Sequence, residues 1–204
     1  MRFPDVLARA VAGDVSAFSE LWRSAQPGLL RYLFVLCSGQ DADDVASESW
    51  LKVIRSLHTF SGDEQAFRAW LTTVARNTAR DLGRQRGRHP ERLDGLVQED
   101  VRAIGGGAED LAIEAVSTRA ALDFVVGTLT PDVAEMVVLR VMVGLDVARV
   151  AELVGRSPGA VRVAVHRGIK SLADALVAPT AGKDAVTGSS GSVTVGALAA
   201  FTVQ

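Results

Sequence analysis

Apolar residues recur along most of the chain at the spacing of an α-helix rather than in the alternation of a β-strand. The first stripe carries Phe18 inward and runs to Cys37, and Asp14 or Ser16 can cap the helix that it predicts. We expect Pro27 to interrupt this helix, because proline lacks the N–H of the backbone ladder. The pattern predicts an all-α fold.

Further segments share this helical period; they are 41–57, 64–86, 111–129, 131–143, 146–154 and 158–176. Between them lies a stretch rich in glycine and acidic residues, which is typical of a linker. We therefore predict two small helical domains joined by a flexible acidic linker, followed by a flexible tail rich in glycine, serine and threonine. The expected divisions are 1–88, 89–129, 130–177 and 178–204.

The two last predicted helices are joined by a short turn, the pattern of a helix-turn-helix. Gly155 suits a turn with positive φ, Ser157 can cap the second helix and Pro158 fits its first turn. On that helix, cations recur every four residues opposite the apolar side, at Arg162, His166 and Lys170. Together with Arg156 in the turn, this face predicts DNA binding; a plain helical hairpin is the alternative.

The predicted helix 64–86 carries a second set of cations at four-residue spacing, Arg76, Arg80 and Arg84. They fall opposite its apolar side, so we expect a cationic outer face that follows a phosphate backbone. Asn77 can reach a base edge or simply solvent. Trp70 lies on the apolar side, which favours a place in the core over a platform for base stacking.

The predicted helix 41–57 begins with acidic residues, where the helix dipole favours them. Asp43, Asp44 and Glu48 form either a solvated first turn or a docking face for a protein partner. In the second case, Trp50 and Leu51 supply the apolar anchor beside the acids.

The distribution of charge along the chain indicates what kind of partner it binds. The chain has 204 residues, 48% hydrophobic, and a net charge of −2 that conceals opposite blocks. Residues 67–92 hold seven arginines against two carboxylates, net +5, whereas residues 93–129 hold two basic against seven acidic groups, net −5. A local basic block in a nearly neutral chain indicates a polyanion as partner of that block alone; a solvated arginine face is the alternative.

Enzymatic chemistry finds little support in the residues. The single cysteine excludes a disulfide framework within one chain, and the three histidines lie in separate segments. No paired acid and base, metal cluster or phosphate-binding loop is evident, so we expect no enzyme, no catalytic residue, no metal and no cofactor. No secretory signal or membrane span is evident either, and we expect a cytoplasmic protein.

The order of these motifs resembles bacterial RNA polymerase sigma factors of the extracytoplasmic-function (ECF) type. Asp41–Leu51 is similar to the helix of that family's region 2 that binds the polymerase clamp. Phe67–Asn77 and the arginines after it are similar to the promoter-melting helix. Gly144–Gly168 resembles region 4, which reads the upstream promoter element.

The resemblance implies roles for these residues. The clamp of core RNA polymerase would bind the predicted helix 41–57 through Asp43, Asp44, Glu48, Trp50 and Leu51. The flap of the polymerase would contact the C-terminal domain of this chain. The −10 element would be recognised and opened by Ser61, Gly62, Asp63, Trp70, Arg76, Asn77, Arg80 and Arg84. The −35 element would be read by Arg156, Ser157, Arg162, His166, Arg167 and Lys170. An anti-sigma factor is a further partner that such proteins often have.

Two other functions stay open. One is a stand-alone helix-turn-helix regulator that binds an operator as a dimer without polymerase. The other is a protein-interaction module held silent by an inhibitor that clamps both domains, which can coexist with the role of a sigma factor.

Overall fold

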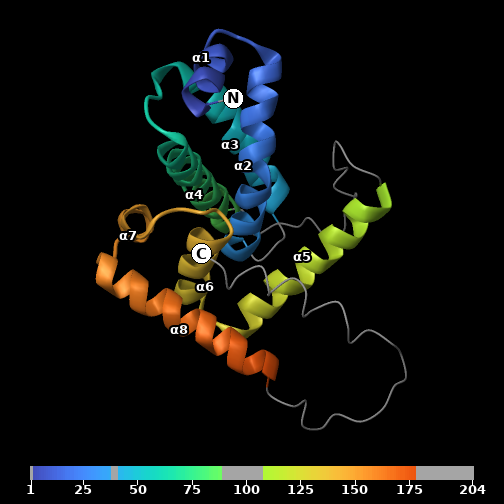
Figure 1. Cartoon of the computed structure of the whole chain (residues 1–204), viewed down its shortest axis with the longest axis vertical. Coiled ribbons are helices and arrows are strands. Elements are labelled where there is room, and N and C mark those ends of the chain that lie inside the picture. Colours follow the sequence, from blue (N-terminus) through green and yellow to red (C-terminus); the bar gives the residue numbers. More distant parts are fainter. Residues whose placement is uncertain (1, 38–40, 89–107, 178–204) are drawn as a thin grey trace.

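The computed structural model describes residues 2–37, 41–88 and 108–177, and within these residues every regular element is helical, which confirms the all-α prediction. The helices are α1 (Phe3–Val11), α2 (Val15–Leu36), α3 (Ala42–Ser56), α4 (Glu64–Arg88), α5 (Ala108–Thr128), α6 (Pro131–Val141), α7 (Val147–Val154) and α8 (Pro158–Val177). They form an N-terminal unit, α1–α4, and a C-terminal unit, α5–α8 (Figure 1).

The N-terminal unit packs around α2 and a cluster of aromatic rings. Phe67 of α4 lies at the centre of the cluster and is 1% exposed. The centroid of its ring lies 5.6 Å from that of Phe60, 5.7 Å from Phe3, 6.1 Å from Trp70 and 6.4 Å from Trp50. This cluster brings together side chains of α1, α3 and α4 and of the segment before α4, so it sets where the outer face of α4 points.

Helix α2 differs from its prediction at one position. It begins after Asp14, whose carboxylate accepts from the backbone N–H of Ser16 at 2.8 Å and of Ala17 at 3.1 Å, as expected for a cap. The predicted interruption at Pro27 is wrong, since the helix continues through it to Leu36. Pro27 itself is exposed while Gly28 beside it is buried, so tertiary packing beside Pro27 keeps the chain helical past the missing backbone bond.

In the C-terminal unit, α7 and α8 form the predicted helix-turn-helix. Gly155 caps α7 with φ of 70°, in the left-handed region, and its neighbour Arg156 donates its backbone N–H to the carbonyl of Ala151 at 3.0 Å. Gly168 lies where α8 crosses α6: a Cβ there would come within 2.8 Å of side-chain carbons of both Val133 and Val137. The close crossing therefore orients the opposite face of α8 outward.

Part of the expected linker belongs to this unit. The segment 89–129 was predicted to connect the domains, but the last turns of α5 pack against α2, α6 and α8, with Leu122 and Val125 buried. Because the apolar residues of these turns pack in the C-terminal unit, the C-terminal unit begins within α5, before the predicted boundary at residue 130. Residues 89–107 and the predicted tail 178–204 lie outside the described residues.

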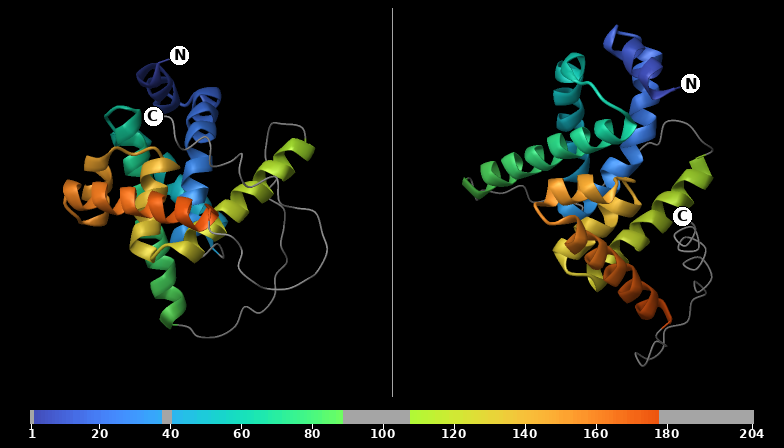
Figure 2. Two further views of the ribbon diagram at one scale, coloured as in Figure 1. Left: turned by 60° about the horizontal axis from the view of Figure 1, so that its bottom comes forward. Right: turned by 60° about the vertical axis from the view of Figure 1, so that its left-hand side comes forward.

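The two units pack directly against each other, which Figure 2 shows from two directions. α2 lies against α5 and α6, and α4 lies against α7. The backbones come close at Gly28, where a Cβ would lie 3.2 Å from the carbonyl oxygen of Met142 and 3.4 Å from the Cα of Val143. The absence of a side chain at this position lets the turn after α6 rest on α2.

Candidate nucleic-acid interface

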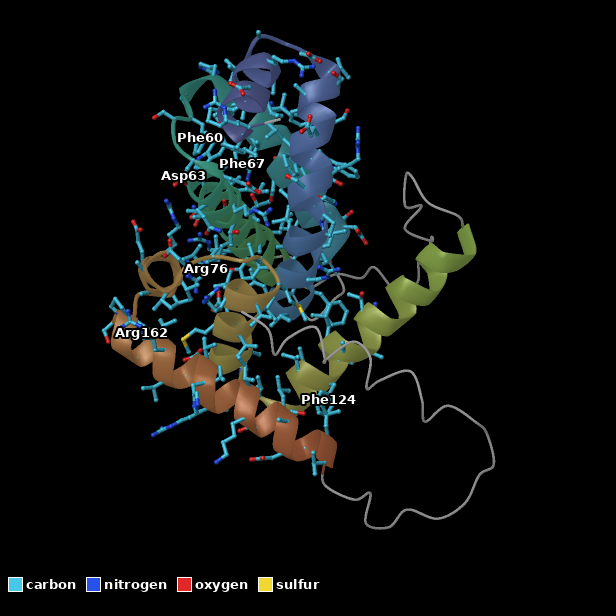
Figure 3. All side chains as sticks on the ribbon, in the orientation of Figure 1. Phe60, Asp63, Phe67, Arg76, Phe124 and Arg162 are labelled. Atoms are coloured by element: carbon cyan, nitrogen blue, oxygen red, sulfur yellow. The ribbon has the colours of Figure 1, made fainter. Side chains whose placement is uncertain are left out.

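The outward face of α8 carries the cations predicted for it. Arg162, His166, Arg167 and Lys170 are all exposed, and Figure 3 shows Arg162 at the end of α8 farthest from α5. Ser157 caps this helix as predicted, because its hydroxyl accepts the backbone N–H of Ala160 at 3.2 Å. The first turns of α8 thus combine exposed helix N–H groups with cations, an arrangement suited to phosphates and to base edges.

Val163 lies in the middle of this cationic face and was not among the predicted residues. It is 50% exposed, although it is apolar. The signal in the sequence was a valine outside the apolar period of its helix. If α8 reads DNA as predicted, an exposed methyl-bearing side chain at this position is suited to contact with a thymine methyl group.

Arg156, in the turn before α8, is exposed but paired: its Nη2 lies 3.0 Å from the carboxylate of Asp132. The pair crosses from the helix-turn-helix to the first turn of α6. Both side chains are more than half exposed, at 58% and 72%, so water screens the attraction and a phosphate can compete for the guanidinium.

The cationic face predicted for α4 is only partly on the surface. Asn77, Arg80 and Arg84 are exposed, and Arg84 pairs with Asp81 at 3.0 Å. Arg76 differs: its side chain is 17% exposed and lies between α4 and the C-terminal unit (Figure 3). The expectation of an outward Arg76 is wrong for this arrangement, because helical periodicity shows which residues share a face but not what covers that face.

The partners of Arg76 all come from the C-terminal unit. Its Nη2 lies 3.3 Å from the carboxylate of Glu135 on α6, and its Nη1 donates to the carbonyl oxygen of Leu153 at the end of α7. The buried hydroxyl of Tyr32, on α2, donates to the same carboxylate at 3.0 Å. Burial first, and then the neighbouring Glu135 charge, raise the pKa of Tyr32 far above its ordinary value, so its proton is held.

The loop before α4 reaches the same interface. Ser61, Gly62 and Asp63 are exposed, and Gly62 has φ of 152°. The carboxylate of Asp63 accepts the backbone N–H of Ala66 at 2.6 Å and lies 3.3 Å from Nη2 of Arg149 on α7. The loop is therefore held from both units.

Trp70 sits at the edge of the aromatic cluster. Its ring stacks on that of Phe60 with centroids 5.0 Å apart and an angle of 23° between the planes. The side chain is half-buried, so it belongs to the packing of the N-terminal unit and still presents one side to solvent.

On α3, the predicted acidic residues lie at or near the surface, whereas one of the two predicted apolar anchors is buried. Asp43, Asp44 and Leu51 are exposed and Glu48 is half-buried. Trp50 is 5% exposed, and its indole N–H donates to Oε1 of Gln26 at 2.6 Å.

The expectation that Trp50 forms a surface anchor is therefore wrong; it belongs to the core, where Phe18 packs edge-on against its ring. Ile54, one helical turn beyond Leu51, is an apolar side chain 51% exposed on the surface of α3 and was not among the predicted residues.

Other classes of site find no counterpart in the described residues. Within 2–37, 41–88 and 108–177, no three histidine, cysteine or carboxylate side chains come together as metal ligands. Among the same residues, none of the helices combines the length and the apolar character needed to cross a membrane.

Two family models match this chain, one in each half. The family model of Sigma-70 region 2 matches residues 21–89, and that of Sigma-70 region 4 matches residues 119–172. The ECF RNA polymerase sigma factor SigD of Mycobacterium tuberculosis is 36% identical over 182 residues, which cover 87% of this chain and 85% of SigD. The chain belongs to the ECF RNA polymerase sigma factors.

A second relative of this sigma factor is BldN of Streptomyces coelicolor, 32% identical over 173 residues. The match covers 84% of this chain but 65% of BldN, so the chain spans just under two thirds of that relative.

Solved structures share the fold. CnrH, in complex with the cytosolic domain of CnrY, is 22% identical with a TM-score of 0.55 over 86% of this chain and 97% of CnrH. The sigma factor RpoE of Bartonella quintana, in complex with the anti-sigma factor NepR, is 20% identical with a TM-score of 0.54 over 81% of this chain and all of RpoE.

The region 2 match covers most of α2 together with α3 and α4, and the region 4 match covers the second half of α5 together with α6, α7 and most of α8. The region 4 match begins at residue 119, within α5, which agrees with the packing of α5 in the C-terminal unit.

Proposed function

We propose that this sigma factor directs core RNA polymerase to specific promoters and helps to open them. The observation that carries the proposal is the pair of cationic helices, α4 in region 2 and α8 in region 4, in one chain of this family. Two separate DNA-reading surfaces at a fixed order along the chain suit a promoter with two separated elements.

Region 4 reads the upstream, −35 element in this proposal. α8 enters the major groove with its first turns, and Arg162, His166 and Lys170 face base edges and phosphates. Arg156, Ser157 and Arg167 hold the helix on the backbone. The support is the exposure of all these side chains and the cap at Ser157.

Region 2 recognises and melts the −10 element. Arg76, Arg80 and Arg84 follow the phosphates of the separated strand, and Asn77 meets a base edge. The loop Ser61, Gly62 and Asp63 receives an unstacked base next to the half-exposed ring of Trp70.

Core polymerase docks on α3. Exposed Asp43, Asp44 and half-buried Glu48 supply a negative rim, and the exposed side chains of Leu51 and Ile54 supply the apolar centre. Trp50 contributes from beneath by supporting this surface rather than by contact.

Run-off transcription with core polymerase tests the proposal. The 5′ ends of the transcripts made by the reconstituted holoenzyme are first sequenced, which maps the promoters. A mapped promoter then serves as the template, and we expect initiation on it to require this sigma factor. No initiation above that of core polymerase alone, on genomic fragments that cover the whole chromosome, would contradict it.

A stand-alone dimeric regulator is not favoured, because region 2 has no part in such a mechanism. Sequence-specific DNA binding at full affinity without polymerase would revive it. In the proposed role the polymerase carries the catalysis, and this sigma factor supplies no catalytic residue, metal or cofactor of its own.

Since transcription takes place on the chromosome, we infer that the protein acts in the cytoplasm. An anti-sigma factor is a further partner to seek, since RpoE of Bartonella quintana, which shares the fold, was solved with one. Co-purification of a small protein with the native chain would reveal such a partner.

A further inference from the structure

The junction between the two units engages side chains that the promoter needs. Arg76 is the central one, because its guanidinium is held by Glu135 and by the carbonyl of Leu153. We propose that Glu135 occupies on Arg76 the place of a promoter phosphate, so that the closed chain withholds Arg76 from DNA and the two units must separate at this contact before Arg76 binds a phosphate. This inference rests on the function proposed for α4.

Chemistry makes the two partners mutually exclusive. A carboxylate and a phosphate both offer two oxygens to the fork of a guanidinium, and both form charge-assisted hydrogen bonds with it. The Nη2 donor of Arg76 faces the carboxylate of Glu135 at 3.3 Å, while Nη1 faces a backbone carbonyl. With both ends of the fork engaged, Arg76 cannot serve a phosphate without losing these contacts.

Glu135 is itself held in position. The hydroxyl of Tyr32 donates to its carboxylate at 3.0 Å, and the Glu135 side chain is 15% exposed. We name Tyr32, Glu135 and Arg76 the interdomain latch. It joins α2, α4 and α6, and so links both units through one carboxylate.

Three further contacts around the latch join the start of α4 and the loop before it to the C-terminal unit. Gln65 donates to the carbonyl of Gly144 at 2.8 Å, and Arg68 to that of Val143 at 3.2 Å. Asp63, in the loop that would receive a base, pairs with Arg149 at 3.3 Å. These side chains begin on α4 or just before it and end on the turn between α6 and α7, or on α7 itself.

The junction has the character of a contact that opens. In the described part of the chain, the buried side-chain atoms that lack a hydrogen-bond partner are Oε1 of Gln65 and Nε of Arg76, both on side chains that cross the junction. A polar cavity of about 110 Å³, lined in part by Arg76, Glu135 and Arg156, lies beside the latch. Incomplete pairing and room for water lower the free energy needed to separate the units.

The closed form leaves the other surfaces exposed. The outward cations of α8 are exposed, and so are Asp43, Asp44 and Leu51 on α3. The closed chain can therefore dock on polymerase through α3 while Arg76 stays in the latch, and release of Arg76 follows docking.

The variant Glu135→Gln tests the latch with the full chain. It keeps the shape of the side chain and a hydrogen-bond acceptor for Tyr32 but removes the charge that competes for Arg76. Glu20→Gln, at an exposed position of α2, removes the same charge elsewhere. The probe is a fluorescently labelled single-stranded DNA of random sequence, because a phosphate contact does not depend on sequence.

We expect Glu135→Gln to bind this probe about tenfold more tightly than the wild type, the effect of one released charge-assisted contact. Glu20→Gln should stay close to the wild type. The gain should vanish in the double variant Glu135→Gln with Arg76→Gln, since the released group is then absent. Equal affinity of Glu135→Gln and wild type, or a gain that survives loss of Arg76, overturns the proposal.

Distance measurements give a second readout. Fluorophores at Val15→Cys on α2 and Asp174→Cys on α8, both exposed, report the separation of the units in a Cys37→Ser background. We expect one short distance in the wild type, a longer population in Arg76→Glu or Glu135→Arg, and a return to the short distance when the two reversals are combined. Circular dichroism checks that each variant keeps its helices.

Charge reversals that leave the distance unchanged, or that fail to compensate each other, overturn the latch. Failure of the proposed function is a separate result, because run-off transcription by the wild type with core polymerase does not depend on which pair holds the closed form.

Discussion

The cationic faces of α4 and α8 follow the same rule in sequence, with a basic residue at every fourth position, yet they meet different surroundings. On α8 the face is exposed along its length, from Arg162 to Lys170. On α4, Arg80 and Arg84 are exposed, whereas Arg76 is enclosed by Glu135 and Leu153 of the other unit. Two similar patterns can thus expose one surface to solvent and hide part of another inside the same molecule.

The difference arises from where each helix is anchored. α8 is fixed on its apolar side by the close crossing at Gly168, and the cations on its opposite side are exposed. α4 is fixed by the aromatic cluster around Phe67, and its free side then faces the turn and helix that follow α6. Substitutions at Phe67 and at Gly168 therefore test the anchoring of α4 and of α8 separately.

Phe67→Ala should have the largest effect. It removes the central ring of the cluster, and large-to-small substitution at such a site costs about 3–5 kcal/mol of unfolding free energy. Chemical denaturation followed by tryptophan fluorescence measures it, because Trp22, Trp50 and Trp70 all lie in the N-terminal unit. Val15→Ala, at a position 78% exposed, is the control and should stay within about 0.5 kcal/mol of the wild type. A loss equal to that of the control would mean that the cluster does not anchor α4.

Gly168→Ala should destabilise the unit that holds α8. The added Cβ meets side chains of Val133 and Val137 at 2.8 Å, and overpacking of this kind costs about 1–3 kcal/mol. The helical signal in circular dichroism should move to lower denaturant more than the tryptophan signal does, since all three tryptophans report on the other unit.

Gly159→Ala on the same helix has nothing within 4 Å of its Cβ and serves as the matched control. If both signals moved together in Gly168→Ala, the contact between the units would couple them into one cooperative structure.

Arg162→Ala should weaken binding of holoenzyme to the upstream element about tenfold or more, as expected for a lost base contact. The measurement is an affinity for the mapped promoter and for a version with a scrambled upstream element. A role in base reading predicts that the variant loses most of its preference between the two. Equal losses on both templates would assign Arg162 to the phosphates instead.

Arg84→Gln should have the smallest effect. Its pair with Asp81 is exposed, so the loss of stability should stay below about 0.5 kcal/mol. If Arg84 meets a phosphate, the slope of log affinity against log salt should fall by about one for the single-stranded probe in the Glu135→Gln background. An unchanged slope would remove Arg84 from the DNA surface.

Much of the fold was predictable because it depends on local patterns. Helical periodicity located α2, α3 and α4 and the helix-turn-helix, and the expected cap at Ser157 and left-handed Gly155 follow from the chemistry of single residues. The break at Pro27 failed because packing around Gly28 outweighs a local preference. Trp50 failed as a surface anchor because an aromatic residue beside acids can still turn inward, given an acceptor such as Gln26.

The sequence by itself determined that this protein is helical, that it has two cationic helices, and that the order of its motifs is that of an ECF sigma factor. These properties depend on which residue types follow one another, and each can be seen within one turn or one helix. Only the tertiary structure decided that Glu135 meets Arg76 across 59 residues of chain, with Tyr32 beneath them. Such a contact depends on how two separately folded surfaces fit, and helical spacing carries no information on that fit.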